Sequence, residues 1–306
     1  MDAQTAVINS QGLFNVHTAY YASPAARGTI ILVNGSLATT TAFAQTLRFL
    51  QSDFNVVLFD QPYAGQSKAH NRHEQPVTAA QEARLLLDLI AHFQADHLLS
   101  FSWGGASSLL ALAQNPPSIR KAVIMGFSPV INPAMRAYLE SGVQVLSQCD
   151  RRGVADLINS TIGKHLPSLY KRFNFRHICN LDEHEYLQMA AHVSQVLHLD
   201  SHCYLQDAEC IDIPMLFVNG ELDEYTSAND ALQFERLIDN CEFARIANAG
   251  HFLDAENKHA WGQTRDAVMG FLLPAGRTAQ ASAYRGLHRS LLGSTLEPSA
   301  ALMASS

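Results

Sequence analysis

The chain has 306 residues, of which 47% are hydrophobic and 16% are charged, and its mean hydropathy is -0.03. This composition is enough for a full core and excludes the disordered class, which combines low hydrophobicity with high net charge. The formal net charge of -7 argues against general nucleic-acid binding, which requires clustered Lys and Arg. The length allows one large α/β domain with an insertion, or two modest domains.

No targeting or membrane signal is visible in the sequence. The segment Met1–Thr5 lacks the basic start and apolar run of a signal peptide, and no apolar stretch reaches about 18 residues. We therefore expect a cytoplasmic protein without a membrane span. The five cysteines include no close C-x-x-C pair, so neither a disulfide framework nor a metal site is predicted.

The amino-terminal part predicts a β-hairpin. The β-prone runs Ala6–Ile8 and Leu13–Tyr21 are separated by the turn-like segment Asn9–Gly12. Six apolar runs follow, each too continuous for a strand with one face in water, and they predict a mostly parallel sheet covered on both faces. These runs are Thr29–Val33, Asn55–Phe59, His97–Phe101, Ala122–Gly126, Pro214–Val218 and Glu242–Ile246.

Helical patterns lie between these runs and predict doubly wound α/β order. The predicted helices are Thr39–Leu50, Thr78–Phe93, Ala106–Gln114 and a helix after Asn257. The stretch 132–205 offers several amphipathic helix patterns and no convincing strand, so it predicts a helical cap inserted between core segments 1–131 and 206–273. The weakly patterned, small-residue stretch 274–306 predicts a disordered tail.

The sharpest motif is Ser100-Phe101-Ser102-Trp103-Gly104, which lies between a predicted strand and a predicted helix. A nucleophile elbow has small residues two positions before and two after its serine, because strand and helix backbones approach closely there. Ser100 and Gly104 meet this need, although Ser100 stands where the usual pattern has glycine. The motif therefore predicts Ser102 as a nucleophile, with an ordinary serine at a strand-to-helix junction as the alternative.

A serine hydroxyl needs a base, and the base needs a group that orients it. Asp223 follows the fifth of the six runs, and His251 follows the last. The order Ser, Asp, His along the chain is that of the α/β-hydrolase fold, which we therefore predict, with a Ser102, Asp223 and His251 triad. Glu221 and Glu224 are the nearby alternatives for the acid.

Acyl transfer also needs donors for the developing oxyanion. The turn Val33–Leu37 follows the first parallel strand, where Gly35 allows close approach of the backbone. The amides of Ser36 or Leu37, together with that of Trp103, are the predicted oxyanion hole. An Asn-Gly turn between strand and helix would explain the same residues without chemistry.

Five segments together resemble the pseudomonad 3-hydroxyacyl-acyl-carrier-protein acyltransferases. They are Val33–Thr40, Phe54–Pro62, Ser102–Gly105, Asp223–Thr226 and Gly250–Asp254, and the similarity runs from about residue 6 to 273. That family includes the (R)-3-hydroxyacyl-ACP:CoA transacylases and 3-hydroxyacyl-ACP thioesterases of polyhydroxyalkanoate synthesis. The resemblance implies an (R)-3-hydroxyacyl chain of medium length, donated by acyl carrier protein and delivered to coenzyme A or water. It implies no cofactor other than coenzyme A as an acceptor substrate.

The predicted cap contains a basic patch of Lys164, Lys171, Arg172 and Arg176. Acyl carrier protein is acidic, so such a patch would steer it, although a solvated helix face explains the same residues. His177 and Asp182 form an H-x-x-x-x-D pattern, known from glycerolipid acyltransferases. Because His177 lies in the predicted cap and not after a strand, we expect no role for it as a general base.

Chemistry alone predicts only serine acyl transfer, so other functions stay open. Within the same class, the alternatives are a hydroxyalkanoyloxyalkanoate synthase of the rhamnolipid type, related to the family above, and a carboxylesterase. A non-catalytic binding protein with a hydrolase fold is the alternative from a different class. Such proteins usually lose a triad residue, and the presence of all three here disfavours it.

Overall fold

The computed structural model describes residues 3–198, 205 and 207–273. The predicted tail, 274–306, residues 199–204 of the predicted cap, and residues 1–2 and 206 of the predicted core segments lie outside the described residues. The predicted domain boundaries therefore stay predictions.

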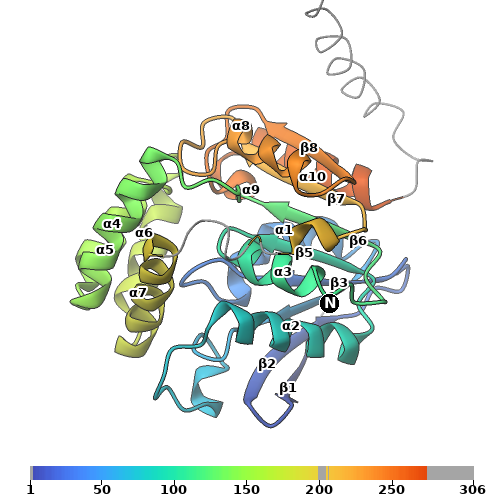
Figure 1. Cartoon of the computed structure of the whole chain (residues 1–306), viewed down its shortest axis with the longest axis horizontal. Helices are drawn as coiled ribbons and strands as arrows, with labels where there is room; N and C mark the ends of the chain where they lie inside the picture. The colour runs from blue at the N-terminus through green and yellow to red at the C-terminus, as the bar shows by residue number, and fades with distance from the viewer. Residues whose placement is uncertain (1–2, 199–204, 206, 274–306) are drawn as a thin grey trace, which may run out of the picture.

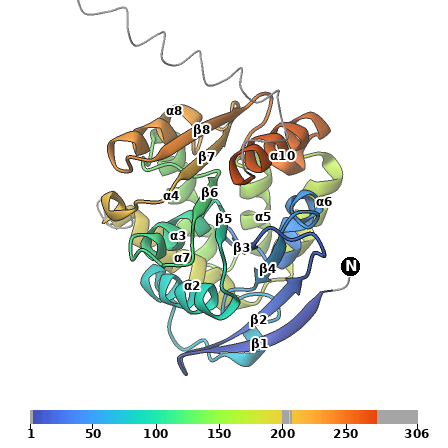
Figure 2. The same cartoon turned by 90° about the vertical axis from the view of Figure 1, so that its right-hand side faces the viewer.

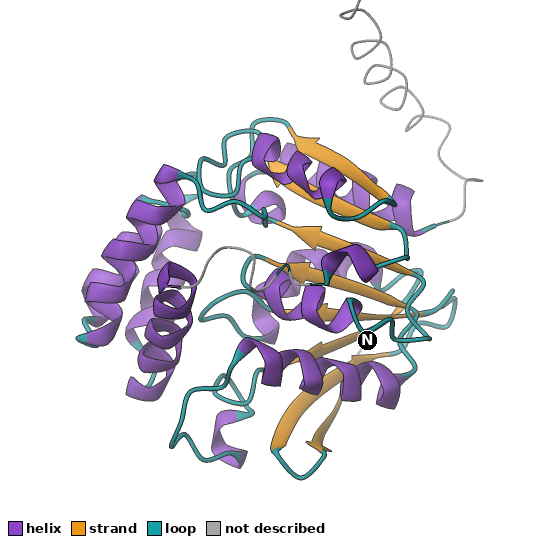
Figure 3. Cartoon of the chain, in the orientation of Figure 1, coloured by secondary structure: helices purple, strands orange, loops and turns teal. Residues whose placement is uncertain are grey.

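An eight-stranded sheet of order β1-β2-β4-β3-β5-β6-β7-β8 forms the centre of the molecule (Figure 3). Its strands are β1 (Gln4–Ser10), β2 (Phe14–Tyr21), β3 (Thr29–Val33), β4 (Asn55–Phe59), β5 (His97–Phe101), β6 (Lys121–Met125), β7 (Met215–Gly220) and β8 (Cys241–Ile246). β2 pairs antiparallel with both β1 and β4, and every other neighbouring pair is parallel. The predicted hairpin and mostly parallel sheet are confirmed.

Alternate side chains of the central strands point to opposite faces of the sheet, as the period of a strand requires. In β3, Ile31 and Val33 belong to the core under α2 and α3, whereas Ile30 and Leu32 belong to the core under α1 and α10. These helices are α1 (Ala44–Leu50), α2 (Ala79–Phe93), α3 (Gly104–Leu112) and α10 (Lys258–Leu272). Figure 2 shows α2 and α3 on one side of the sheet and α10 on the other.

Strand β8 departs from the prediction. It was expected to be covered on both faces, but of its six residues only Ile246 is buried. The reason is its place at the edge of the sheet, beside β7 alone. Its continuous apolar pattern was therefore a poor guide to its burial.

Four helices follow one another between β6 and β7, and we call them the cap. They are α4 (Pro133–Ser147), α5 (Arg151–Ser160), α6 (Ser168–Cys179) and α7 (Glu183–His198). The side chains of Asn132 and Asp150 cap the first turns of α4 and α5. Figure 1 shows the cap grouped on one side of the sheet, beyond the carboxyl ends of the parallel strands. Its apolar cluster reaches the core through Leu37 and Trp103.

Short helical turns account for most remaining differences from the prediction. The predicted helix 39–50 consists of a 3₁₀ turn, η1 (Thr40–Phe43), followed by α1, and the segments η2 (Lys68–His70), η3 (Ala208–Cys210), α8 (Ala228–Ala231), η4 (Leu232–Arg236) and α9 (Leu253–Glu256) were not predicted. Such turns are too short for a helical period to show in sequence. Within the described residues, no helix is both long enough and apolar enough to cross a membrane.

Candidate active site

Ser102 lies in the tight turn between β5 and α3. Its φ of 51° is in the left-handed region, which costs a non-glycine residue energy and is found at functional turns. The turn is fixed by a bond from the amide of Ser102 to the carbonyl of Met125 at 2.8 Å. At Gly104, an added Cβ would lie 2.6 Å from the Asn34 carbonyl oxygen. The small residue in the motif is thus required by the close approach of α3 to the loop after β3.

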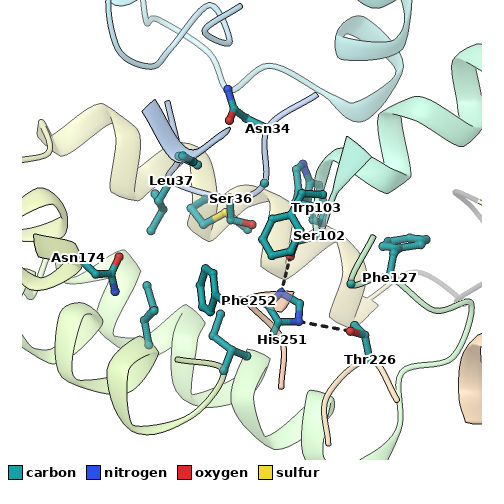
Figure 4. Close-up of a pocket in the computed structure, with 18 of the residues that line it drawn as sticks. Asn34, Ser36, Leu37, Ser102, Trp103, Phe127, Asn174, Thr226, His251 and Phe252 are labelled. Atoms are coloured by element: carbon teal, nitrogen blue, oxygen red, sulfur yellow. Dashed lines mark hydrogen bonds between the residues drawn. The ribbon is translucent and has the colours of Figure 1, made fainter. Parts of the chain in front are cut away.

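The predicted triad residues meet beyond the ends of β5, β7 and β8. Nε2 of His251 lies 3.0 Å from Oγ of Ser102, and Nδ1 lies 2.8 Å from Oδ2 of Asp223. Figure 4 shows the imidazole between Ser102 and Thr226. Asp223 and His251 are both buried, so the hydrogen bond between them is shielded from bulk water. This arrangement allows His251 to take a proton from Ser102.

The two alternative acids form ion pairs with other residues. Glu221 pairs with Arg245 at 3.3 Å, and Glu224 pairs with Lys164 at 2.8 Å. Both glutamates are exposed, and neither is bonded to His251. The geometry therefore favours Asp223 over its sequence neighbours.

Asp223 is held in its ionised form. Burial opposes ionisation, but the facing His251 and hydrogen bonds from His251 and Thr226 outweigh it and lower the pKa to about 2. The Thr226 hydroxyl donates to Oδ2 at 2.6 Å, and the amides of Tyr225 and Thr226 donate to Oδ1 at 2.9 and 3.1 Å. A carboxylate with this many donors fixes the imidazole and stabilises its charged form.

Sequence reasoning missed a second buried carboxylate at the site, that of Glu256. It accepts hydrogen bonds from the amides of Gly250 and Phe252, on either side of His251. Glu256 lies at the end of α9, a four-residue helix without a sequence signal. Its only hint was its nearness to His251 in the chain.

The predicted oxyanion donors lie on two turns that face Ser102. Within the described residues, the backbone amides of Ser36, Leu37 and Trp103 have no hydrogen-bond partner. Leu37 has a φ of 55°, a left-handed conformation that the surroundings must hold in place. Free amides beside a serine are what a developing oxyanion needs.

His177 contacts this loop, which the sequence analysis did not foresee. Its Nε2 lies 2.7 Å from the carbonyl oxygen of Leu37, and its side chain lines the pocket above Ser102. Asp182 instead binds Lys68 at 2.7 Å. The H-x-x-x-x-D residues therefore do not form a dyad in this fold.

The four basic residues predicted to dock a carrier protein divide into two groups. Lys164 pairs with Glu224, and the Lys171 ammonium donates to the carbonyl of Lys164 at 2.8 Å. Arg172 and Arg176 are exposed on α6. Two apolar residues of α6 are exposed beside them, Leu169 at 50% and Phe173 at 52%. We call Leu169, Arg172, Phe173 and Arg176 the α6 face.

A cavity of about 500 Å³ lies between the core and the cap, and both Ser102 and His251 line it. Most of its wall is apolar, with contributions from α4, α5 and α7. The carboxyl group of Asp254 also lines it, where burial raises its pKa to about 6 against a hydrogen bond from Thr46. A mostly apolar cavity with a few polar groups is the usual form of a small-molecule site.

One group of neighbouring metal-ligand side chains occurs among the described residues, formed by Asp182, His184 and Glu185. The ammonium of Lys68 lies 2.7 Å from Asp182 and 2.9 Å from Glu185. Both carboxylates thus already have a cation as their partner. These three residues therefore give no reason to propose a metal site.

Comparison with known proteins places these observations in context. Residues 28–257 match a family described as alpha/beta hydrolase fold. An (R)-3-hydroxydecanoyl-ACP:CoA transacylase of Pseudomonas putida is 57% identical over 277 residues, which is 90% of this chain and 94% of that protein. A protein of the same name from Pseudomonas aeruginosa is 54% identical over 90% of this chain and 91% of its own length.

Solved structures show the same fold at low sequence identity. An alpha/beta hydrolase enzyme from a deep-sea metagenome library superposes with a TM-score of 0.70 at 16% identity, over 90% of this chain and 100% of its own. A carboxylesterase of Bacillus subtilis superposes with a TM-score of 0.66 at 18% identity, over 88% and 93%. The predicted α/β-hydrolase architecture is confirmed.

Proposed function

The chain belongs to the α/β-hydrolase fold family and, within it, to the family of the (R)-3-hydroxydecanoyl-ACP:CoA transacylases. From that premise we propose that it is an enzyme that moves an (R)-3-hydroxyacyl group from acyl carrier protein to coenzyme A through Ser102. The observation that carries the proposal is the hydrogen-bonded chain from Ser102 through His251 to Asp223 in the wall of an apolar cavity. We propose the cytoplasm as its location, because acyl carrier protein and coenzyme A are its proposed donor and acceptor.

In the first half-reaction, Oγ of Ser102 attacks the thioester carbonyl while Nε2 of His251 takes the hydroxyl proton. The amides of Trp103 and of Ser36 or Leu37 donate to the carbonyl oxygen as it becomes negative. The C–S bond then breaks, and the departing thiolate of the carrier takes the proton from His251. The acyl group remains as an ester of Ser102.

The second half-reaction repeats these steps in reverse. The thiol of coenzyme A gives its proton to Nε2 of His251 and attacks the ester carbonyl. The bond between the acyl carbon and Oγ of Ser102 breaks, and Oγ recovers the proton. Asp223 stays ionised throughout and stabilises the charged imidazole each time it forms.

Water competes with coenzyme A for the acyl-enzyme, and the outcome decides between a transacylase and a thioesterase. A transferase requires its acceptor to be bound and oriented at high effective concentration. The names of the two pseudomonad relatives favour coenzyme A. The mostly apolar cavity wall supports this, because it leaves few groups to bind a water molecule.

The α6 face is the proposed docking surface for acyl carrier protein. It combines two exposed arginines with two exposed apolar side chains beside the cavity. An acidic partner is attracted by the arginines and buries apolar area against Leu169 and Phe173. Lys164 and Lys171, which the sequence placed in the same patch, contribute less because their ammonium groups are already bonded.

The test is a product analysis with purified protein and 3-hydroxydecanoyl-acyl-carrier protein, with and without coenzyme A. The proposal predicts that 3-hydroxydecanoyl-coenzyme A is the main product when coenzyme A is present and that little free acid forms without it. Free 3-hydroxydecanoic acid appearing at the same rate in both reactions would make the protein a thioesterase. Condensation of two hydroxyacyl chains would make it a hydroxyalkanoyloxyalkanoate synthase.

A further inference from the structure

The lining of the cavity differs between its two ends. Side chains from α4, α5 and α7 are apolar except for the phenol of Tyr138, and none of them is exposed. Side chains from η1 and α6 include exposed ones, with Thr41 on η1 and Tyr170 and Phe173 on α6 at 37% and 52%. The cavity is therefore closed under α4, α5 and α7 and opens between η1 and α6. We call this open end the mouth.

Polar groups concentrate at the mouth. Nε2 of Gln45 donates to the hydroxyl of Tyr170 at 2.9 Å, so α1 and α6 are joined across it. Asn174 donates through Nδ2 to Asn159 at 2.9 Å, and its Oδ1 has no donor among the described residues. Figure 4 shows Asn174 on the cap side of the cavity. The mouth thus offers hydrogen-bonding groups that the closed end lacks.

A guanidinium group is anchored on each side of the mouth. Arg48, on α1, donates through an Nη atom to Oε1 of Gln45 at 3.1 Å. Arg176, on α6, places its guanidinium carbon 5.3 Å from the centre of the Phe173 ring, which lines the cavity. Both arginines are exposed, and neither has a carboxylate partner within the described residues. Apart from the Nη atom of Arg48 that donates to Gln45, their donors can bind an anion.

The charge around the mouth favours an anion there, although the whole chain carries a formal charge of -7. Among the described lining residues, Asp254 has the only carboxyl group. Burial raises its pKa to about 6, so it ionises less readily than an ordinary aspartate. It also accepts a hydrogen bond from Thr46 at 2.6 Å. The two arginines at the mouth thus outnumber the carboxyl groups of the described lining residues.

We propose that the mouth binds the phosphopantetheine arm of the substrate. Arg48 and Arg176 bind its phosphate, and Oδ1 of Asn174 accepts a hydrogen bond from one of its amides. The proposal rests on the proposed function, because it concerns the arm that carries the thioester to Ser102. With the acyl chain in the closed apolar end, the rest of the substrate leaves by the mouth. A guanidinium matches the geometry of a phosphate oxygen pair, which a lysine ammonium does not.

Acyl carrier protein and coenzyme A present the same arm and the same first phosphate. One mouth therefore serves both the donor and the acceptor, which bind in turn. The sequence shows no glycine-rich phosphate loop for coenzyme A, and in this proposal the two arginines bind the phosphate instead. Arg48 had no sequence signal, since it stands alone in a short helix far from Arg176 in the chain.

The test compares donors that share one 3-hydroxydecanoyl group. The thioesters of pantetheine and of 4′-phosphopantetheine differ only by the phosphate. We expect wild-type protein to prefer the phosphorylated donor about tenfold in kcat/KM, from charge-assisted hydrogen bonds. Arg48→Gln and Arg176→Gln should each reduce that ratio toward one, mainly through KM. Arg84→Gln, at an exposed position of α2, is the matched control and should keep the ratio.

Two further measurements test the two carriers separately. Arg48→Gln should raise KM for 3-hydroxydecanoyl-acyl-carrier protein as donor and for coenzyme A as acceptor. If Arg48→Gln affected KM for one carrier alone, the proposal that both carriers use the mouth would be wrong. It would also be wrong if the wild type used pantetheine and phosphopantetheine donors equally well. If no thioester of any kind acylates Ser102, the proposed function itself fails. The two failures are distinguishable, because the pantetheine thioester still acylates Ser102 if only the proposal for the mouth is wrong.

Discussion

Glu256 holds the main chain on both sides of His251. One carboxylate oxygen accepts from the amide of Gly250 at 2.6 Å, and the other accepts from the amide of Phe252 at 3.0 Å. Glu256 is buried, so these bonds are not exchanged with water. The imidazole of His251 therefore has two supports, Asp223 at its ring and Glu256 at its backbone.

Replacing Glu256 tests the backbone support. In Glu256→Gln, one of the two amides faces an NH₂ group instead of an acceptor, which costs about 1–3 kcal/mol locally. We expect kcat to fall about tenfold with little change in KM, because the imidazole and not the acyl pocket is displaced. Steady-state kinetics beside Glu235→Gln, an exposed control on η4, measure this. Wild-type kcat in a folded Glu256→Gln protein would show that Asp223 alone positions the base.

The pKa of Asp223 predicts a pH-dependent contribution to stability. Its pKa of about 2 in the folded protein lies below 3.8, the ordinary pKa of an aspartate, so the ionised carboxylate stabilises the fold above pH 4 and loses this effect as the pH falls toward 2. The contribution is about 2 kcal/mol at neutral pH and about half of that at pH 3. Urea unfolding of wild type and Asp223→Asn at pH 7 and pH 3 should show their difference shrinking. A difference that is independent of pH would contradict the assignment.

The contact between His177 and Leu37 predicts a moderate effect on catalysis. His177→Ala leaves the carbonyl of Leu37 unpaired and loosens the oxyanion loop, so kcat should fall about tenfold. The loss should be far smaller than that of His251→Ala, which removes the base. Asp182→Asn is the matched control, because Asp182 binds Lys68 and not His177. If Asp182→Asn and His177→Ala both lost all activity, the H-x-x-x-x-D pair would be part of the catalytic machinery.

The α6 face predicts a donor-specific effect. Arg172→Glu should raise KM for acyl-carrier-protein thioesters strongly at low salt and weakly at high salt, because exposed charges are screened. Coenzyme A thioesters should be affected much less, since coenzyme A lacks the protein surface that Arg172 is proposed to contact. Lys171→Glu is the comparison, as its ammonium is already bonded within the cap. Equal losses with both donors would remove the α6 face as a docking surface.

Much of the core followed from the sequence because local patterns determine it. The predicted runs Thr29–Val33 and Asn55–Phe59 coincide with β3 and β4, and the predicted helix Thr78–Phe93 coincides with α2 and its N-cap residue, Thr78. Ser102 was visible because its elbow restricts the residues beside it. In each case the sequence pattern lies within a few residues of the strand, helix or turn that it predicts.

The features that the sequence did not predict depend on contacts between segments that are far apart in the chain. Gln45 meets Tyr170, and His177 meets Leu37, only because the cap packs over the core. Arg48 at the mouth is placed by the same packing. Neither periodicity nor motif spacing reports which helix of an insertion faces which loop of the core, so these residues needed the structure.

An acyl-enzyme at Ser102 is the central intermediate of the proposed reaction. Protein mixed with 3-hydroxydecanoyl-acyl-carrier protein in the absence of coenzyme A should be quenched in acid, digested and mapped by mass spectrometry. We expect a 3-hydroxydecanoyl ester on Ser102. When coenzyme A is added, this ester should disappear at the rate at which acyl-coenzyme A forms. Ser102→Ala should fold, carry no acyl group and lose about a thousandfold or more in turnover. An unmodified Ser102 at full turnover, or near-wild-type turnover by folded Ser102→Ala, would contradict this mechanism.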